Sequence, residues 1–223
     1  MSLYAEPDIA GKQRALVDQQ LTAMWEGHPP AHFASLGELL QWLYDVLGDP
    51  SCLTLLDAAC ATAYYADIIQ HYVGDWIEYY GIDFNPGMVA MVQRPYPWLH
   101  VVQGDVCNMD MFSDRTFDIV LSGATIMHIE DWHSAVRELT RVSHRWLILH
   151  RTWILTDTET PTRVEMRDAY GHLVPYITFN EQELMTLVRE CGFELQRIVP
   201  SGETSPSWGN FTYLFERNET RRD

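Results

Sequence analysis

Three carboxylates stand at the ends of short apolar segments that have the pattern of successive β-strands. Asp57 ends the first segment, Asp83 the second and Asp105 the third. Ligands of open parallel sheets bind beyond the carboxyl ends of the strands, so strand-ending residues are the first candidates for a binding site. An acidic residue about 20 positions after the first strand–helix turn commonly binds ribose hydroxyls, and Asp83 has that spacing. The alternative for each carboxylate is a turn or helix-cap role.

Further polar residues follow the fourth and fifth predicted strands. Ser122 and Gly123 end the fourth strand, His128 lies in the loop after it, and His150 and Arg151 end the fifth. Two roles stay open for His128, a general base or a loop residue that hydrogen-bonds to backbone carbonyls. Arg151 either binds an anionic substrate or pairs with one of the many carboxylates. We assign all of these residues except Ser122 and Gly123 to the side of the site that receives the substrate.

The residue types that bind metals lack the spacing of a metal site. No pair of cysteines has the CxxC spacing, and no two of the four histidines near the strand ends are four positions apart. We therefore expect no metal and four reduced thiols, as in a cytoplasmic protein. The residues are Cys52, Cys60, Cys107, Cys191, His128, His133, His144 and His150.

Composition narrows the class of protein. The chain has 223 residues, 47% of them hydrophobic, which favours one domain with a buried core. The 31 acidic residues outnumber the 15 basic ones, and a net charge of -16 argues against a nucleic-acid partner. The longest apolar stretch, 142–155, is interrupted by charged residues and is too short to span a membrane. The start of the chain lacks the pattern of a secretion signal.

The first 48 residues have the pattern of a helical preface. One helix is expected near 15–26, and a second from about Leu36, with Ser35 and Glu38 as a capping box. Its leucines recur on one face, and Gly48 followed by Pro50 gives the stop signal.

From residue 49 onward, strand and helix patterns alternate, which predicts an α/β core of residues 49–223 in a single domain. Asn85 with Pro86, Asp131, and Asn180 with Glu183 are expected to open helices. Residues 153–178 lack a regular pattern and form an insertion on the substrate side. The predicted strands are 52–58, 76–83, 99–105, 117–123 and 145–152, followed by an antiparallel pair, 193–199 and 210–217.

Four segments in this order resemble the class I S-adenosylmethionine-dependent methyltransferases. They are LLDAACATAYYADII, YYGIDFNPGMVAMV, VVQGDVCNMDMFSDRTFDIVLSGATIMHI and FNEQELMTLVRECGFELQRI, and the resemblance spans roughly residues 36–217. It implies a doubly wound, mostly parallel seven-stranded sheet of Rossmann-like type, with only the last-inserted strand antiparallel. It also implies S-adenosyl-L-methionine as cofactor and methyl transfer to a small or medium-sized organic molecule.

The resemblance assigns a role to each matching position. The first loop would face the methionine end, Asp83 the ribose, the next residues the adenine, and the end of the fourth strand the sulfonium. Position and composition, and not the resemblance, place Trp25 and Tyr44 of the preface in the acceptor pocket with the 153–178 insertion, His128, His150 and Arg151; the alternative for the aromatic residues is the core. The cofactor-binding candidates are Asp57, Ala59, Cys60, Ala61, Asp83, Phe84, Met88, Asp105, Val106, Ser122 and Gly123.

One departure from the family pattern bears on function. Where the family usually has three glycines, this chain has Ala59, Ala61 and Ala63. Three alanines at positive φ would together cost about 3–6 kcal/mol, so we expect most of these positions to have negative φ. An adenosylmethionine-binding protein without turnover is the alternative function. A nicotinamide dehydrogenase is disfavoured because the G-x-G-x-x-G spacing is absent.

Overall fold

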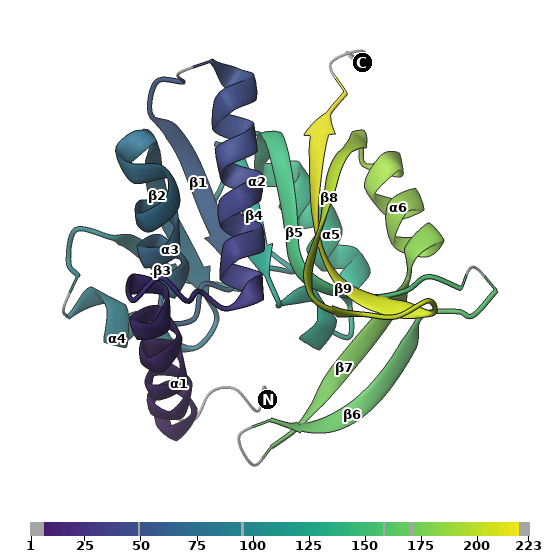
Figure 1. The fold of residues 1–223 in the computed structure, drawn as a ribbon, viewed down its shortest axis with the longest axis horizontal. Coiled ribbons are helices and arrows are strands. Elements are labelled where there is room, and N and C mark those ends of the chain that lie inside the picture. Colours follow the sequence, from purple (N-terminus) through teal and green to yellow (C-terminus); the bar gives the residue numbers. More distant parts are fainter. Residues whose placement is uncertain (1–6, 49, 95, 158, 170–171, 219–223) are drawn as a thin grey trace.

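The computed structural model describes residues 7–218 except 49, 95, 158, 170 and 171 (Figure 1). The helices are α1 (Pro7–Trp25), α2 (Ala31–Leu47), α3 (Tyr64–Val73), α4 (Pro86–Gln93), α5 (Trp132–Val142) and α6 (Glu181–Glu190), with short 3₁₀ helices η2 (Gly74–Trp76) and η3 (Ile126–His128). The strands are β1 (Leu53–Ala58), β2 (Ile77–Asp83), β3 (His100–Gln103), β4 (Phe117–Gly123), β5 (Ser143–Leu155), β6 (Arg163–Ala169), β7 (His172–Asn180), β8 (Phe193–Thr204) and β9 (Trp208–Arg217).

The central sheet has the predicted doubly wound topology. Strands β3, β2, β1, β4 and β5 lie side by side in that order and are parallel. β9 pairs antiparallel with β5 on one side and with β8 on the other. The predicted doubly wound, mostly parallel sheet is therefore confirmed, with β9 antiparallel to both of its neighbours, whereas the predicted count of seven strands is too low. The change in strand order between β1 and β4 is the switch point at which such sheets bind ligands.

Residues 153–178 were expected to be irregular, and this prediction was wrong because most of the segment forms β-strands. β5 runs on to Leu155, and β6 and β7 form an antiparallel hairpin that brings the sheet to nine strands. β7 joins the sheet through a short parallel pairing in which Ile154 faces Phe179. Arg163 to Arg167 of β6 do alternate between polar and apolar residues, a strand signal that the sequence-based prediction missed, although Val164 and Met166 are exposed in the fold.

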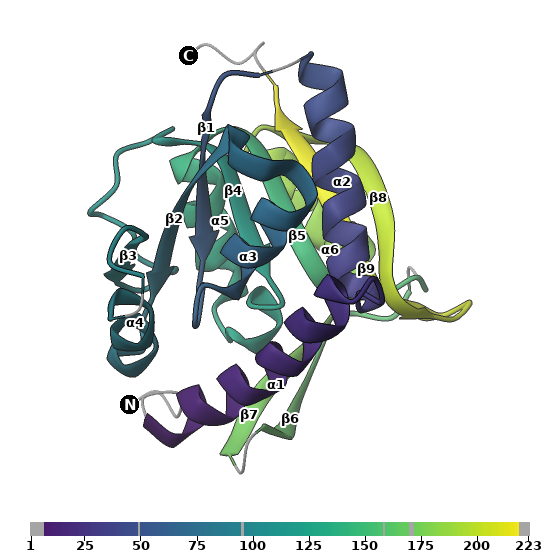
Figure 2. The same ribbon diagram turned by 60° about the vertical axis from the view of Figure 1, so that its left-hand side comes forward.

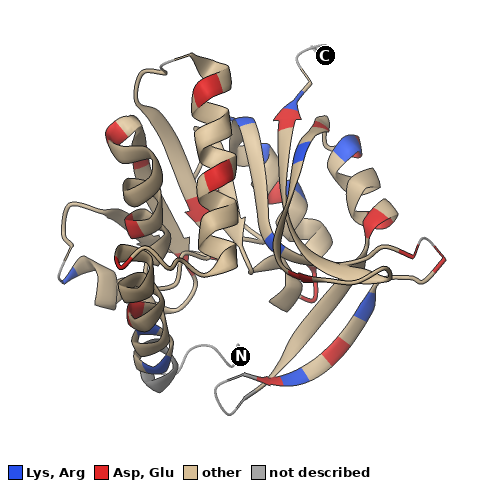
Figure 3. Ribbon diagram, in the orientation of Figure 1, with Lys and Arg blue, Asp and Glu red and all other residues tan. Residues whose placement is uncertain are grey.

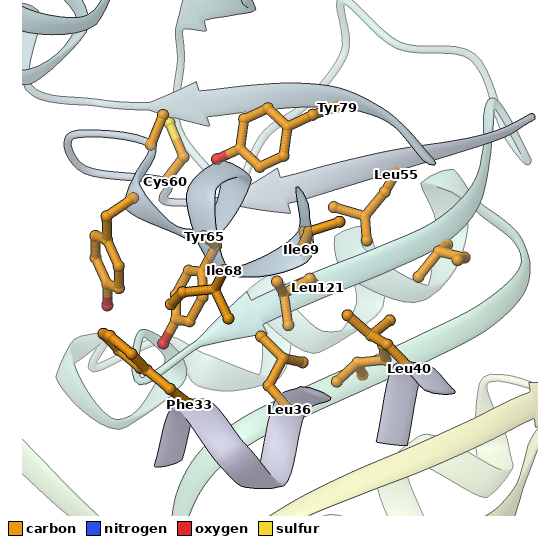
Figure 4. Close-up of a cluster of buried hydrophobic side chains, with 14 of the residues drawn as sticks. Phe33, Leu36, Leu40, Leu55, Cys60, Tyr65, Ile68, Ile69, Tyr79 and Leu121 are labelled. Atoms are coloured by element: carbon orange, nitrogen blue, oxygen red, sulfur yellow. The ribbon is translucent and has the colours of Figure 1, made fainter. Parts of the chain in front are cut away.

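Helices cover both faces of the sheet (Figure 2). α2 and α3 pack on one face, with α1 and α4 beside them, and Figure 4 shows Leu36 and Leu40 of α2 directed towards Ile68 and Ile69 of α3 and Leu121 of β4. α5 and α6 pack on the opposite face against the alternate residues of the same strands. Strands β1, β2, β4 and β5 are therefore apolar on both sides, as expected for a parallel sheet, whereas the edge strand β3 buries only Val101.

Side-chain caps begin three of the helices as predicted. Asn85 accepts hydrogen bonds from the backbone of α4, Asp131 from α5 and Asn180 from α6. The capping box at Ser35 and Glu38 was wrong. α2 begins at Ala31 after Pro30, so both residues lie inside the helix.

The carboxyl ends of the parallel strands point to one edge of the molecule. In Figure 1, α1 and the β6–β7 hairpin extend beyond this edge on opposite sides. α1 begins at Pro7, earlier than the predicted start near Ala15, which gives the helix the length to reach this edge. Among the described residues, no helix is long and apolar enough to cross a membrane.

Candidate functional site

A cavity of about 630 Å³ lies at the carboxyl ends of the strands. This volume falls within the range of small-molecule sites. The strand-end loops form most of its wall, and α1, η3 and β7 complete it. The residues proposed from sequence that line the cavity are Ala59, Ala61, Asp83, Phe84, Met88, Asp105, Val106, Gly123, His128 and Arg151.

The loop after β1 has left-handed backbone at all three alanines. The φ angles are 62° at Ala59, 50° at Ala61 and 55° at Ala63, so the expectation of negative φ was wrong. Hydrogen bonds hold this conformation: the Cys60 amide donates to the Ile82 carbonyl at 3.0 Å, and the Ala63 amide to the Cys60 carbonyl at 2.7 Å. The loop therefore has the backbone form for which glycine is the usual residue.

Asp83 connects this loop to the next one. One carboxylate oxygen accepts from the Ala61 amide and the other from the Asn85 amide, each at 2.8 Å. Burial raises the pKa of Asp83, and the two backbone hydrogen bonds partly oppose that shift. A carboxylate has about four acceptor positions, so Asp83 retains capacity to accept from a ligand in the cavity it lines.

Asp57 lies behind the loop and does not line the cavity. Its Oδ2 accepts a 2.6 Å hydrogen bond from the Tyr79 hydroxyl, and its buried Oδ1 has no hydrogen-bond partner among the described residues. Burial raises the pKa of Asp57 to about 7, although the Tyr79 hydrogen bond acts in the opposite direction. The geometry therefore gives Asp57 a supporting place beneath the loop and no direct contact with the cavity.

Three other sequence candidates are also buried away from the cavity. Cys60 packs against Gly81, where an added Cβ would lie 2.7 Å from its sulfur. Ser122 is 2% exposed and His150 is 1% exposed. His150 Nδ1 lies 2.7 Å from the Thr212 hydroxyl, and burial lowers its pKa well below the usual value. These side chains support the strand ends from within the core.

The part of the cavity beyond β2 and β3 combines apolar and polar residues. Phe84 and Met88 line it, with Asp105 and Val106 from the loop after β3. Asp105 Oδ1 accepts from the Cys107 amide at 2.8 Å, which fixes its carboxylate in a turn. This arrangement of two apolar side chains and one carboxylate suits a flat, polar-edged group such as a purine.

The opposite part of the cavity lies under η3 and β7. His128 Nδ1 is 2.8 Å from the Pro175 carbonyl, which accepts only, so the neutral ring carries its hydrogen on Nδ1 and its lone pair on Nε2. Burial lowers the pKa of His128 and so favours the neutral ring. Arg151 lines the same part of the cavity.

The sequence did not identify several wall residues. Gln13 comes from α1 and Tyr64 from the start of α3, whereas Val174 and Pro175 of β7 belong to the 153–178 segment that was expected to form the acceptor pocket. Tyr64 follows the alanine loop directly, so its position was the one available signal. Trp25 and Tyr44, proposed for the acceptor pocket, do not line the cavity. Trp25 is 58% exposed beside His71, and Tyr44 packs against Trp76.

Histidine, cysteine and acidic side chains do not gather into a metal-binding group anywhere in the described part of the chain. All four cysteines, including Cys107 at the cavity, are free thiols. Burial and neighbouring carboxylates raise the pKa of Cys107 to about 11, so this thiol is a poor nucleophile at neutral pH.

The sheet order and the ligand-sized cavity at its switch point define a class I methyltransferase fold. Comparison with known proteins agrees: residues 56–145 match the family model described as a methyltransferase domain. The resemblance inferred from the sequence is confirmed at the level of fold and domain.

Individual relatives are distant. The chain is 30% identical over 90 residues to a demethylmenaquinone methyltransferase of Lysinibacillus sphaericus. The matched segment covers 39% of this chain and 38% of that protein. It superposes on magnesium protoporphyrin IX methyltransferase of Synechocystis PCC 6803, solved with bound SAM, with a TM-score of 0.58 at 17% identity, covering 84% and 80% of the two chains. For 1,6-didemethyltoxoflavin-N1-methyltransferase of Burkholderia thailandensis, the TM-score is 0.60 at 14% identity, covering 96% and 92%.

Proposed function

We propose that this protein binds S-adenosyl-L-methionine in the strand-end cavity and transfers its methyl group to a small or medium-sized organic molecule. The observation that carries the proposal is the pairing of Asp83 with the Ala61 amide at the edge of the cavity. This pairing places a carboxylate with spare acceptor capacity beside the left-handed loop. The carboxylate can accept from ribose hydroxyls, and the loop backbone can approach the rest of the ligand closely.

The residues present fit the methyl donor. Asp83 would hold the ribose hydroxyls, Phe84 and Met88 would enclose the adenine, and Asp105 with Val106 would meet its amino edge. Gly123 lines the cavity near the reacting end, and it must be glycine because an added Cβ would lie 2.2 Å from the buried Tyr65 ring. When bound, the donor supplies an electrophilic methyl group on a sulfonium. The protein then needs mainly to position the acceptor and exclude water.

His128 is the residue that we assign to proton removal. Its ring is oriented by the Pro175 carbonyl, and the lowered pKa keeps Nε2 unprotonated at neutral pH. A base is required only when the acceptor must lose a proton. The net charge of -16 makes a nucleic-acid acceptor unfavourable, and four free thiols support a cytoplasmic location.

Calorimetric titration with S-adenosylhomocysteine tests the proposed site. Asp83→Ala should weaken binding at least tenfold, because the ribose hydroxyls lose their acceptor at a cost of about 1.5–3 kcal/mol. Asp45→Ala, on the exposed side of α2, is the matched control and should bind like the wild type. Asp83→Asn, which retains one acceptor oxygen, provides a second variant if Asp83→Ala does not fold. Unchanged binding in a folded Asp83 variant removes the residue from the site.

A screen for methyl transfer to diverse organic acceptors separates an enzyme from a protein that only binds the donor. The second candidate function rests on the alanine loop, and it predicts binding of S-adenosylhomocysteine with no turnover. Once an acceptor is identified, His128→Ala should lower turnover about 10²–10⁴-fold with little change in donor affinity. The exposed His133→Ala serves as control. Full turnover in His128→Ala would show that His128 has a structural role and does not remove the proton.

A further inference from the structure

β5 is irregular at the point where it reaches the cavity. Two of its residues, His150 and Arg151, lie between the Leu149–Tyr213 and Thr152–Phe211 pairs, where β9 has only Thr212. Arg151 has a φ of 58°, which an L-residue with a large side chain rarely adopts. Such bulges redirect a side chain, and backbone strain concentrates at functional sites. Arg151 consequently lies against Tyr64 and Tyr65 of α3 and lines the cavity.

Among the described arginines without a carboxylate partner, Arg151 is set apart by its place in the cavity wall: Arg94, Arg115, Arg137 and Arg163 are exposed to solvent, and Arg217 donates to backbone carbonyls. No carboxylate of the described residues lies within 4 Å of the Arg151 nitrogens, although acidic residues outnumber basic ones two to one. Figure 3 shows charged residues on the helices and on β6, and among them Arg14 pairs with Asp18 and Arg167 with Glu165. The arginines that do pair with a carboxylate are Arg14, Arg141, Arg145, Arg167, Arg189 and Arg197.

The neighbours of Arg151 are neutral groups. The nearest are the phenols of Tyr64 and Tyr65, and its positive charge contributes to the lowered pKa values of His32, His128 and His150. Burial is the larger cause of each of these shifts, and it lowers the pKa of His32 to about 3. Within the described wall of the cavity, Arg151 is the one lysine or arginine. A largely buried guanidinium without a counter-charge is costly, so a ligand that brings the counter-charge will be bound strongly.

The position of Arg151 favours the acceptor over the methyl donor as that ligand. The residues assigned to the donor come chiefly from the ends of β1, β2 and β3, whereas β5 lies beyond β4 in the strand order. His128, which packs on β7, lies in the same part of the cavity.

We infer that Arg151 binds an oxyanion and that this oxyanion belongs to the acceptor, which is therefore an organic acid with a carboxylate or phenolate group. This inference rests on the proposed function for the identity of the ligand. The anion site itself rests on the bulge and on the unmatched guanidinium.

Benzoate and its neutral analogue benzamide are the probes, titrated against protein saturated with S-adenosylhomocysteine. The wild type should bind benzoate at least tenfold more tightly than benzamide. Arg151→Gln should lose this preference, Arg151→Lys should keep part of it, and both should bind S-adenosylhomocysteine within threefold of the wild type. Arg145→Gln, at the opposite end of β5, should behave as the wild type. Melting curves establish that each variant is folded, and Arg151→Lys keeps the test decisive if Arg151→Gln unfolds.

Equal binding of the two probes by the wild type, or an undiminished preference in a folded Arg151→Gln, overturns the inference. A tenfold loss of S-adenosylhomocysteine affinity in Arg151→Gln, with 5′-methylthioadenosine binding unchanged, assigns the oxyanion to the donor's carboxylate and overturns the acceptor assignment. Failure of S-adenosylhomocysteine to bind the wild type contradicts the proposed function instead. Benzoate selectivity measured on the protein alone then still decides the anion site.

Discussion

The alanines of the loop after β1 store strain in a segment that the fold holds in place. A non-glycine residue in the left-handed region costs about 1–2 kcal/mol, and Ala59, Ala61 and Ala63 all adopt it. The Asp83 carboxylate and the neighbouring backbone hydrogen bonds determine the loop conformation, so the chain tolerates the cost.

Replacing these alanines with glycine should stabilise the protein. Each Ala→Gly change at 59, 61 or 63 should raise the free energy of unfolding by about 0.5–1 kcal/mol, since the removed strain exceeds the added chain entropy of glycine. Urea denaturation measures the effect. Ala90→Gly in the interior of α4 is the control and should destabilise by about 1 kcal/mol. A destabilised Ala61→Gly would mean that alanine contacts outweigh the strain.

The loop also shows what residue types alone could not predict. The sequence identified the three alanines as replacements for glycine, but it did not contain their dihedral angles. The expectation of negative φ considered only the conformational cost of positive φ at each alanine. It omitted the hydrogen bonds that Asp83 and Ile82 supply from β2, a different part of the chain. Asp83 was identifiable because its strand-end position and its spacing are both visible in the sequence.

At the scale of elements, hydroxyl groups connect α2, β8, β9 and β5 through the core. Ser35 donates to Ser201 at 3.2 Å, Ser201 hydrogen-bonds to Thr212, and Thr212 to His150 Nδ1. These side chains are all buried, and only Ser35 has a second acceptor, the His32 carbonyl at 3.0 Å, among the hydrogen bonds of the described residues. This series of hydrogen bonds fixes the position of α2 relative to the sheet and holds the His150 side chain next to the bulge in β5.

Thr212→Val tests this connection, because valine has nearly the same shape and lacks the hydroxyl. The change leaves His150 Nδ1 without its partner and should lower the free energy of unfolding by about 1–3 kcal/mol in urea denaturation. Thr140→Val is the matched control. Thr140 is also buried, but its hydroxyl donates to carbonyls of its own helix, so its loss should cost less than about 1 kcal/mol. Equal losses in the two variants would show that the connection adds no stability.

Elements were predictable where local signals and burial agree. Asn85 with Pro86 opens α4, and the apolar run of β4 begins and ends at the predicted residues, 117 and 123. The prediction of a capping box at Ser35 and Glu38 failed because α2 already begins after Pro30, and inside the helix both residues contact β8 instead: Ser35 bonds to Ser201 and Glu38 pairs with Arg197. Long-range contacts of this kind leave no local pattern.

At the scale of the whole molecule, the free energy of unfolding should depend on pH through Asp57. Burial raises the pKa of this carboxyl from 3.8 to about 7 in the folded protein. Between these values, the folded state holds a proton that the unfolded state has released. The contribution of Asp57 to stability is therefore fully present below about pH 3.8 and is lost as the pH rises through about 7.

Asp57→Asn isolates this contribution, because the amide oxygen can still accept from Tyr79 but the side chain no longer titrates. Each pH unit between 5 and 7 should cost the wild type about 1.4 kcal/mol relative to the variant, or roughly 2–3 kcal/mol over the interval. Urea denaturation of both proteins at pH 5, 6, 7 and 8 measures the difference, and the buried histidines cancel because both proteins contain them. The variant should thus gain stability over the wild type as the pH rises, with the difference levelling off above pH 7. A difference that stays constant across this range would mean that Asp57 is ionised throughout and that water reaches its second oxygen.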